Sequence, residues 1–335
     1  MLYGGKIMAN KKCLINSDGT VDVAEAESLS PTDGYCVFEV KACGICGSDI
    51  PRVFAGASYY YPIVLGHEFA GVVKDSKRPE LIGKRACIFP ILPCGECEFC
   101  KKQQWASCKS YSYYGSRRDG GMQSELLIKE ENLIELPEGV SLDAGSMIEP
   151  SAVCLHAVKK GNIKKGGSVL IYGAGTIGLL SGLWARALGA AEVFFSDPDQ
   201  RRIAFAEKLG FKACGECEAD TVIEASGAPA ALIDAIERCK TEGTIVLVGH
   251  GKRDVTIPHD IFVRILRKQL TLTGSWNSDF TDSVNDWQDS IDAIAKGLID
   301  PEALITHRVP LENADSAFKI IGEGKEFYNK ITVVM

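Results

Sequence analysis

The stretch Ser168-Val169-Leu170-Ile171-Tyr172-Gly173-Ala174-Gly175-Thr176-Ile177-Gly178 carries the strongest indication of the fold. Five β-favouring residues precede a turn with three glycines, and apolar residues at helical spacing follow up to Leu188. Such a strand, turn and helix can hold a pyrophosphate, because glycines let the backbone approach it and the helix N-terminus offers unpaired N–H donors. Asp197 ends the next apolar run, at about the ~20-residue distance typical of dinucleotide sites. The stretch therefore predicts a dinucleotide-binding site.

The charge at Asp197 bears on which dinucleotide binds. A carboxylate there can accept both ribose hydroxyls of NAD and would repel the 2′-phosphate of NADP. Arg201 and Arg202 follow closely and could pair with such a phosphate, but with the acid present we predict NAD. The predicted cofactor-binding residues are Gly173, Gly175, Ile177, Gly178, Asp197 and Arg202.

Alternation of short β-rich runs with helical stretches from about residue 168 to 275 predicts an α/β fold with a parallel sheet covered by helices. The expected strands are 168–172, 192–195, 221–224, 244–248 and 270–273, and the expected helices are 177–188, 200–209 and 230–239.

The first 150 residues instead contain short strands broken by Gly, Pro and Cys, such as 35–40 and 69–73, which predicts a separate, mainly β domain. A helix over 314–321 and a strand over 330–334 are expected to rejoin that domain. The predicted domains are residues 1–155 with 295–335, and residues 156–294.

Composition narrows the classes of partner. A chain of 335 residues with net charge −7 and no block of Lys or Arg lacks the footprint that nucleic acid or an anionic membrane would need. The N-terminus has no apolar stretch of secretory type, so we expect a cytoplasmic protein. Residues 166–185 are uncharged, but their glycines favour a strand, turn and helix over a membrane span.

Four cysteines at short spacing predict a structural metal site. Cys94, Cys97, Cys100 and Cys108 can surround a tetrahedral ion, and four sulfurs leave no open position for substrate, which is typical of structural zinc. Iron in an S4 site is an alternative, because sulfur ligation does not exclude it.

A second pair, Cys214 and Cys217, has the same local spacing but no second half nearby. We expect ordinary surface or partly buried thiols there, with redox chemistry or adventitious metal binding as alternatives.

A catalytic metal is indicated by Cys46, His67, Glu68 and Glu149. One thiolate, one imidazole and one or two carboxylates form an incomplete shell, whose open position can bind and polarise an alcohol. His67 alone would more often be a structural histidine, but its combination with the dinucleotide motif favours the metal.

These motifs together resemble the zinc-containing medium-chain dehydrogenases, in their polyol dehydrogenase branch. The resemblance spans nearly the whole chain and is carried by Gly44 to Asp49, Leu65 to Gly71, the four clustered cysteines, Asp119-Gly120-Gly121, Glu149-Pro150 and Gly173 to Gly178. It implies a GroES-like β-rich catalytic domain interrupted by a Rossmann domain, two zinc ions, and a homodimer or homotetramer. It also implies oxidation of a secondary alcohol on a small-molecule polyol or polyol phosphate, with hydride transfer to NAD.

By the same resemblance, Cys46 and His67 are zinc ligands, Glu68 and Glu149 bind the metal or its water, and Ser48 passes on the substrate proton. Pro51 stands where many relatives have a relay histidine shortly after the serine, so cofactor ribose, water and Glu149 remain candidates for the final acceptor. Other functions left open are a zinc dehydrogenase for free sorbitol, L-threonine or butanediol, and a non-catalytic zinc scaffold.

The arginines near the zinc motifs suggest a phosphorylated substrate. Arg52, Arg117 and Arg118 flank these motifs, and a guanidinium matches the geometry of phosphate. The alternative is that Arg117 and Arg118 pair with Asp119 or Glu125.

Overall fold

The computed structural model describes residues 10–251 and 253–335, which divide into two compact units. One unit contains the residues up to Glu149 together with Ile305–Met335, and the other is Pro150–Leu304. The boundaries expected after residues 155 and 294 differ from these. The first observed boundary lies between Glu149 and Pro150, near the start of α3 (Ile148–Lys160), so most of this helix belongs to the second unit. The second lies after η5 (Glu302–Leu304), which also belongs to the second unit.

The first unit is built on a seven-stranded sheet in the order β16-β17-β3-β4-β5-β9, with β8 also paired to β3. Its strands are β3 (Tyr35–Gly44), β4 (Glu68–Asp75), β5 (Arg85–Ile88), β8 (Glu125–Lys129), β9 (Leu133–Glu135), β16 (Ile305–Pro310) and β17 (Lys330–Val334). Two-stranded sheets are formed by β1 (Asn10–Ile15) with β2 (Val21–Ala26) and by β6 (Ile91–Leu92) with β7 (Ser112–Tyr113). The unit is mainly β, as expected.

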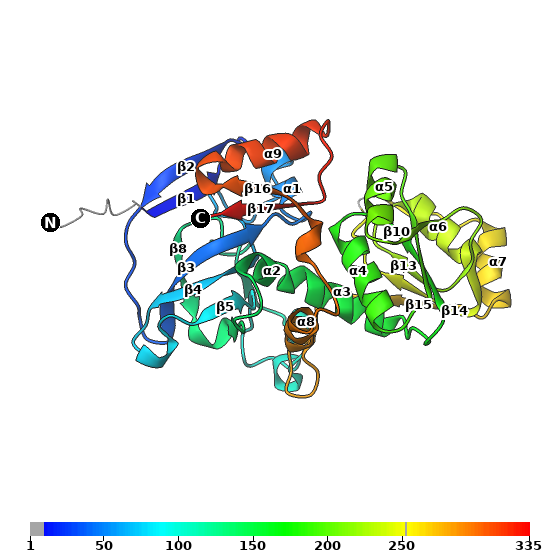
Figure 1. The fold of residues 1–335 in the computed structure, drawn as a ribbon, viewed down its shortest axis with the longest axis horizontal. Helices are drawn as coiled ribbons and strands as arrows, with labels where there is room; N and C mark the ends of the chain where they lie inside the picture. The colour runs from blue at the N-terminus through cyan, green and yellow to red at the C-terminus, as the bar shows by residue number, and fades with distance from the viewer. Residues whose placement is uncertain (1–9, 252) are drawn as a thin grey trace. The chain divides into compact units, whose positions relative to one another are not determined.

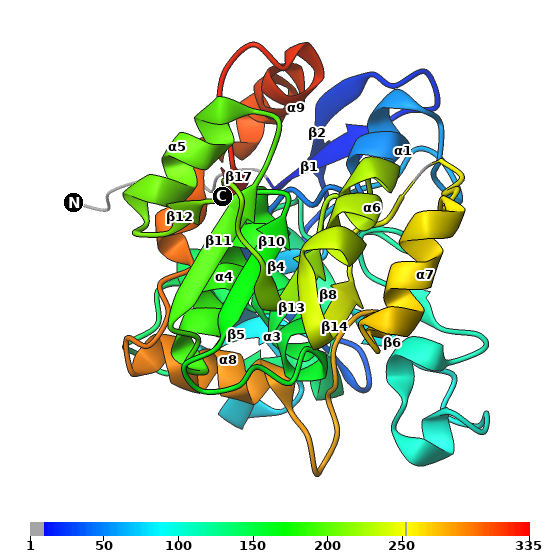
Figure 2. The ribbon, with the colours of Figure 1, turned by 90° about the vertical axis from the view of Figure 1, so that its right-hand side faces the viewer.

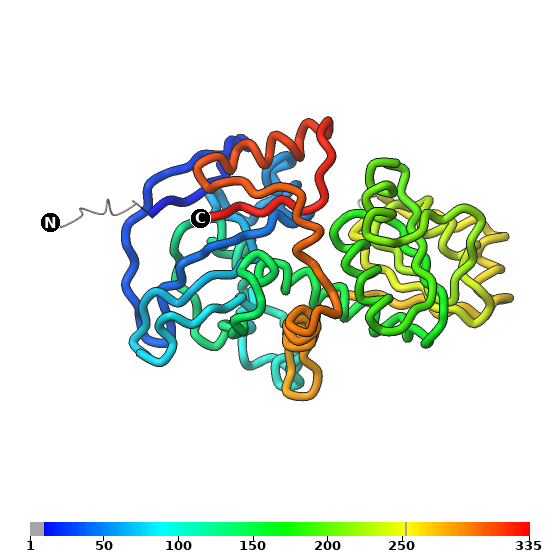
Figure 3. The backbone as a smooth tube through the Cα atoms, viewed as in Figure 1, coloured from blue at the N-terminus to red at the C-terminus, as the bar shows by residue number. Residues whose placement is uncertain are grey.

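A C-terminal segment completes this sheet. β17 pairs antiparallel with β3, with Thr332 opposite Gly44, and the red ribbon of β17 lies beside the blue β3 in Figure 1. The tube in Figure 3 follows the same return of the chain. The helices of the first unit are α1 (Ile50–Phe54), α2 (Leu142–Ser146) and α9 (Ala314–Glu323).

The second unit has a six-stranded parallel sheet in the order β12-β11-β10-β13-β14-β15. The strands are β10 (Ser168–Tyr172), β11 (Glu192–Ser196), β12 (Lys212–Ala213), β13 (Ala219–Glu224), β14 (Cys239–Leu247) and β15 (Thr271–Gly274). Figure 2 shows β11, β10, β13 and β14 side by side in that order. Since the chain starts at β10 and builds outward in both directions, the order reverses between β10 and β13, where doubly wound sheets bind ligands.

The helices of this unit are α3, α4 (Thr176–Ala187), α5 (Gln200–Lys208), α6 (Pro229–Arg238), α7 (His259–Arg267) and α8 (Asp286–Ala295). The three helices expected from the sequence are α4, α5 and α6, each within a residue of its predicted bounds. The α/β fold class is confirmed. None of the helices in the described part of the chain combines the length and apolar character that a bilayer crossing requires.

Candidate functional site

Cys46, His67 and Glu68 are brought together by the pairing of β3 with β4. Gly44, at the end of β3, lies opposite Glu68, at the start of β4. Cys46 follows the first strand and His67 precedes the second, so the hairpin-like register places both beside Glu68. One ligand atom from each of the three residues lies within 4.8 Å of the others. Their convergence is therefore a consequence of sheet register.

Glu68 has a buried cationic partner that the sequence did not reveal. Lys330, the first residue of β17, donates from Nζ to Glu68 Oε2 and, at 3.1 Å, to the carbonyl of Ile45. The side chains of Lys330 and Glu68 are 3% and 1% exposed. A Cβ at Gly44 would stand 2.4 Å from Glu68 Oε2, so any larger residue there would displace this carboxylate from its present position.

Asp49 organises the loop that carries Cys46. Its Oδ2 accepts from the Cys46 backbone N–H at 3.0 Å, and its Oδ1 lies 3.8 Å from His67 Nδ1 and 3.3 Å from Arg52 Nη1. Burial raises the pKa of Asp49, although His67 and Arg52 oppose that rise. Asp49 ends the motif that contains Cys46, but its residue type alone indicates no role there. The structure assigns it to positioning Cys46.

Glu149 lies in the first turn of α3 and outside the close set formed by Cys46, His67 and Glu68. Its Oε1 accepts from the Tyr113 hydroxyl at 3.1 Å. Burial raises the pKa of Glu149 to about 7, against the opposing effect of His67. The ring of Tyr113 also meets that of His67 edge-on, with centroids 5.5 Å apart. Tyr113 thus connects Glu149 to the set and, after Lys330 and Asp49, is a third residue whose role the sequence did not indicate.

The chemistry of these donors fits a zinc ion. Thiolate sulfur, imidazole nitrogen and carboxylate oxygen are the ligands that zinc takes in catalytic sites. Nδ1 of the buried His67 has no hydrogen-bond partner among residues 10–251 and 253–335. Although burial lowers the pKa of His67, the neighbouring Cys46 and Asp49 raise it to about 10. The acidic groups around His67 therefore favour binding of a cation among them.

Ser48 is exposed beside this set. Its backbone N–H points to Cys46 Sγ at 3.5 Å, and its Oγ accepts from Arg52 Nη1 at 3.3 Å. Because the arginine donates to Oγ, the serine's own proton is available to another acceptor.

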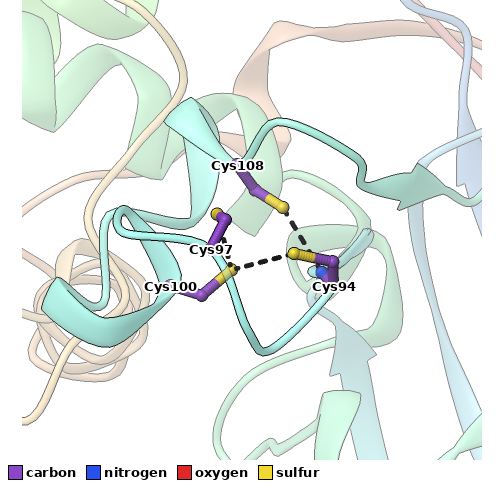
Figure 4. Close-up of side chains that lie close together, drawn as sticks. All are labelled: Cys94, Cys97, Cys100 and Cys108. Carbon is purple, nitrogen blue, oxygen red and sulfur yellow. Dashed lines mark hydrogen bonds between the residues drawn. The ribbon is translucent and has the colours of Figure 1, made fainter.

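Cys94, Cys97, Cys100 and Cys108 converge on one point (Figure 4). The Sγ of Cys100 lies 3.8 Å from that of Cys94 and 3.5 Å from that of Cys97. Zinc–sulfur bonds of about 2.3 Å place tetrahedral sulfurs about 3.8 Å apart, so the spacing matches the ion. Backbone N–H groups, that of Lys109 first, lower the pKa of Cys97 to about 6, which favours the thiolate that a metal needs.

The glycine turn between β10 and α4 has the geometry that its motif predicts. Gly173 has a φ of +94°, a left-handed conformation that favours glycine. A Cβ at Gly178 would lie 1.8 Å from the Gly173 carbonyl oxygen, so the helix can pack on the turn only if this residue is glycine. Asp197 directly follows β11, and its Oδ2 accepts from the Ala174 backbone N–H at 2.8 Å.

A cavity of about 830 Å³ opens at the carboxyl ends of these strands. Of the predicted cofactor residues, Gly173, Gly175, Asp197 and Arg202 line it. Ile177 and Gly178 do not, since they lie further along α4. The lining also includes Tyr172, Ser226 and Asp234, which the sequence analysis did not name. The cavity is of the size that a nucleotide moiety requires.

The three arginines considered for phosphate recognition have different surroundings. Arg117 is stacked over the rings of Tyr59 and Tyr111, at 5.0 and 4.1 Å from their centroids, and donates to the Tyr111 carbonyl. Arg118 lies over the ring of Tyr114 at 5.2 Å.

The expected alternative partners of these two arginines are engaged elsewhere. Asp119 Oδ1 accepts from the backbone N–H of Val64 and from the hydroxyl of Tyr60, and Glu125 contacts Lys74 and Asn10. Pairing of Arg117 with Asp119 or Glu125 is therefore not what the structure shows. Arg52 differs from both, because its Nε is buried and has no hydrogen-bond partner in the part of the chain that the structure describes.

Cys214 and Cys217 are bonded to each other in a disulfide. The expectation of ordinary thiols was wrong at this position. Spacing alone did not reveal it, because the same Cys-X-X-Cys pattern at Cys94 and Cys97 leads to free thiols in the four-sulfur cluster.

Comparison with known proteins identifies relatives of both units. The family model described as "Alcohol dehydrogenase GroES-like domain" matches residues 32–138, and the one described as "Zinc-binding dehydrogenase" matches residues 176–296. Galactitol 1-phosphate 5-dehydrogenase of Escherichia coli K12 is 32% identical over 93% of this chain and 96% of its own length. Sorbitol dehydrogenase 1 of Saccharomyces cerevisiae is 31% identical over 89% of this chain and 90% of its own.

Solved structures agree with these relatives. The crystal structure of galactitol-1-phosphate dehydrogenase from Escherichia coli matches 97% of this chain and 100% of its own, with a TM-score of 0.88 at 31% identity. A short chain alcohol dehydrogenase (rspB) from E. coli CFT073, complexed with NADH, matches 98% of this chain and 100% of its own, also with a TM-score of 0.88, at 25% identity.

Proposed function

The chain belongs to the zinc-type medium-chain dehydrogenases and is an oxidoreductase, and we propose that it oxidises a secondary alcohol of a polyol or polyol phosphate to the ketose, with NAD as hydride acceptor. The observation that carries the proposal is the convergence of Cys46, His67 and Glu68 in one unit, together with a nucleotide-sized cavity beside Asp197 in the other. A zinc scaffold without catalytic function would need neither feature.

Cys46, His67 and one glutamate would hold the catalytic zinc. Glu68 is paired with Lys330, so we propose Glu149, whose Oε1 accepts from the Tyr113 hydroxyl, as the carboxylate that would bind the metal or its water. When bound, zinc lowers the pKa of an alcohol, as it lowers that of water from about 15.7 to about 7, and NAD takes the hydride. The exposed Ser48 hydroxyl accepts the substrate proton and passes its own to solvent.

On the cofactor side, Asp197 supplies the acceptor for the ribose hydroxyls, and the Gly173 to Gly178 turn receives the pyrophosphate. Asp197 is well held for this role, since its Oδ2 and Oδ1 accept from the backbone N–H groups of Ala174 and Asp199, both at 2.8 Å. Arg201 does not compete for a 2′-phosphate, because it pairs with Asp199. We therefore propose NAD as the preferred cofactor.

A phosphorylated substrate is supported by Arg52. Its buried Nε has no protein acceptor, and its Nη1 contacts Ser48, so a phosphate near the reacting alcohol would supply the missing acceptor. Arg117 has its guanidinium stacked between two tyrosines and serves as the matched control.

The test is a panel of free and phosphorylated hexitols and pentitols, followed by NADH absorbance. We expect a hexitol phosphate to exceed the free hexitol in kcat/KM, and Arg52→Gln to narrow that ratio chiefly by raising KM for the ester. Arg117→Gln should leave the ratio unchanged. Better turnover of free hexitols, with a ratio that Arg52→Gln does not change, would assign the chain to the dehydrogenases of free polyols. Failure to reduce NAD with any alcohol would refute the proposal.

We further propose a homodimer formed through the second unit. β15 is an edge strand of the sheet and exposes Leu272, at 36%, and Trp276 follows it at 65%. The preceding helix α7 exposes Phe262 and Leu266, at 48% and 62%. An unpaired edge with apolar flanks is suited to pairing with a second copy. Light scattering should show a dimer that Leu272→Asp converts to a monomer, while a monomeric wild type would refute this surface.

A further inference from the structure

The Cys214–Cys217 disulfide is difficult to explain as a device for stability. It closes a ring between residues three apart, with a Cα–Cα distance of 5.7 Å. Such a short ring excludes few unfolded conformations, and the entropic benefit of a disulfide grows with loop length. Among the described residues, no other cysteine forms a disulfide. Both bonded residues are half-buried, so a dissolved thiol can reach them, whereas a thiol such as Cys239 is buried.

One side of the disulfide turn is tied to the strand that leads to Asp197. β12 pairs in parallel with β11, with Ala213 opposite Phe195. The Cys214 backbone N–H then donates to the Phe195 carbonyl at 2.8 Å. Asp197, which lines the cavity, is two residues further along the chain. A shift of the turn therefore acts on the end of β11.

The other side of the turn is tied to the cavity through Arg238. Its Nη1 donates to the carbonyls of Gly215, at 2.9 Å, and Cys217, at 3.4 Å. Its Nε donates to Asp234 Oδ1 at 2.9 Å. Asp234 Oδ2 accepts from the Tyr172 hydroxyl at 2.8 Å, and Tyr172 and Asp234 both line the cavity. Arg238 thus joins the closed turn to the wall of the dinucleotide cavity.

We propose that Cys214 and Cys217 form a reversible dithiol–disulfide switch that sets the affinity of this cavity for its dinucleotide. The inference rests on the proposed function of the cavity. In the closed form, with the disulfide intact, the bond holds the carbonyls of Gly215 and Cys217 where Nη1 of Arg238 can donate to both. In the open form the turn is released, Arg238 loses these acceptors, and Asp234 is held less firmly in the cavity wall.

The redox step exchanges two electrons with a dithiol. One thiolate of the dithiol attacks either sulfur, breaks the Cys214–Cys217 bond and forms a mixed disulfide. The second thiolate of the dithiol then displaces the protein sulfur. Cys214 and Cys217 end as thiols after gaining two electrons and two protons, and the dithiol ends as a cyclic disulfide. The reverse exchange with an oxidised dithiol closes the switch.

The test measures NADH binding by fluorescence on the zinc-loaded full chain, equilibrated in buffers of reduced and oxidised dithiothreitol. Alkylation with peptide mass spectrometry reports the state of Cys214 and Cys217. We expect the Kd for NADH to rise about threefold to tenfold on reduction, which corresponds to the loss of one or two hydrogen bonds. Cys214→Ser/Cys217→Ser should show the weaker Kd in every buffer.

Two further variants test whether the redox state of the turn acts on the cavity through Arg238. Arg238→Gln should form the disulfide but lose the dependence of Kd on the redox buffer. Arg264→Gln, which removes an exposed ion pair with Glu237 on the same unit, should retain that dependence.

The proposal is overturned if the oxidised and reduced wild type bind NADH equally, or if the pair cannot be cycled between its two states. It is also overturned if the double serine variant still responds, because other thiols would then be responsible. Each of these results leaves the proposed function in place. Absence of NADH binding by the oxidised wild type would refute the proposed cofactor site as well.

Discussion

Replacing Lys330 with Met should strongly destabilise the first unit. Methionine keeps the length and apolar stem of the side chain but removes the amine that neutralises Glu68, and the two side chains are only 3% and 1% exposed. Leaving a buried charge without its partner costs about 3–5 kcal/mol. At about 2–4 °C per kcal/mol for a unit of this size, the unfolding midpoint should fall by about 6–20 °C.

Circular dichroism of the zinc-loaded protein measures this shift. Zinc content measured in parallel distinguishes a variant that has lost its metal from one that has lost only the Lys330–Glu68 pair. Lys319→Met removes an exposed pair with Asp315 on α9 and should cost less than about 1 kcal/mol. Glu68→Gln/Lys330→Met should be less destabilised than the sum of the two single variants, because the two residues interact directly. A Lys330→Met protein that melts within about 1 °C of wild type would show that the buried pair is not a source of stability.

Four more outcomes are expected. Cys100→Ala should lose one zinc ion and melt earlier, and full zinc content in that variant would contradict the four-sulfur site. Asp197→Ala should erode the preference for NAD over NADP in kcat/KM, and unchanged discrimination would remove Asp197 from the ribose site. Ser48→Ala should keep both zinc ions but lose about 10²- to 10⁴-fold in kcat, and an unaltered rate would exclude its hydroxyl from proton transfer. Hydrogen bonds from Ser168 lower the pKa of Asp220 from 3.8 to about 2, so the ionised carboxylate stabilises the fold above about pH 4 and this contribution is lost toward pH 2. The difference in melting temperature between wild type and Asp220→Asn should therefore shrink from pH 6 to pH 3, and a constant difference would refute this linkage.

The parts of the site that sequence could predict are those fixed by local chemistry. A glycine turn between a strand and a helix has few alternatives, because a Cβ at Gly178 would meet the Gly173 carbonyl. The short spacing of Cys94, Cys97, Cys100 and Cys108 likewise predicts that their sulfurs meet around one ion. Cys46 and His67 were identified by residue type, and the register of β3 with β4 explains why they meet.

The parts that could not be predicted depend on distant partners. Lys330 lies 262 residues from Glu68, and a single lysine at the start of an apolar strand gives no hint of burial. Arg117 lies beside acidic residues in sequence, yet its guanidinium is stacked on Tyr59 and Tyr111. Cys214 and Cys217 have the same spacing as a zinc pair, and only the absence of a second pair near them distinguishes the two.

The position of β16 and β17 in the sheet has a consequence for biosynthesis. Because ribosomes deliver the chain from its N-terminus, all of Pro150–Leu304 is made before these strands, and that unit can fold while the first still lacks the partner of β3 next to Cys46. Until Lys330 emerges, Glu68 has no buried cation, and the edge of β3 is open to pairing with other chains. The first unit therefore matures last, and a chain that ends between residues 305 and 330 would carry a complete second unit attached to a sheet that lacks β17 and has the edge of β3 exposed.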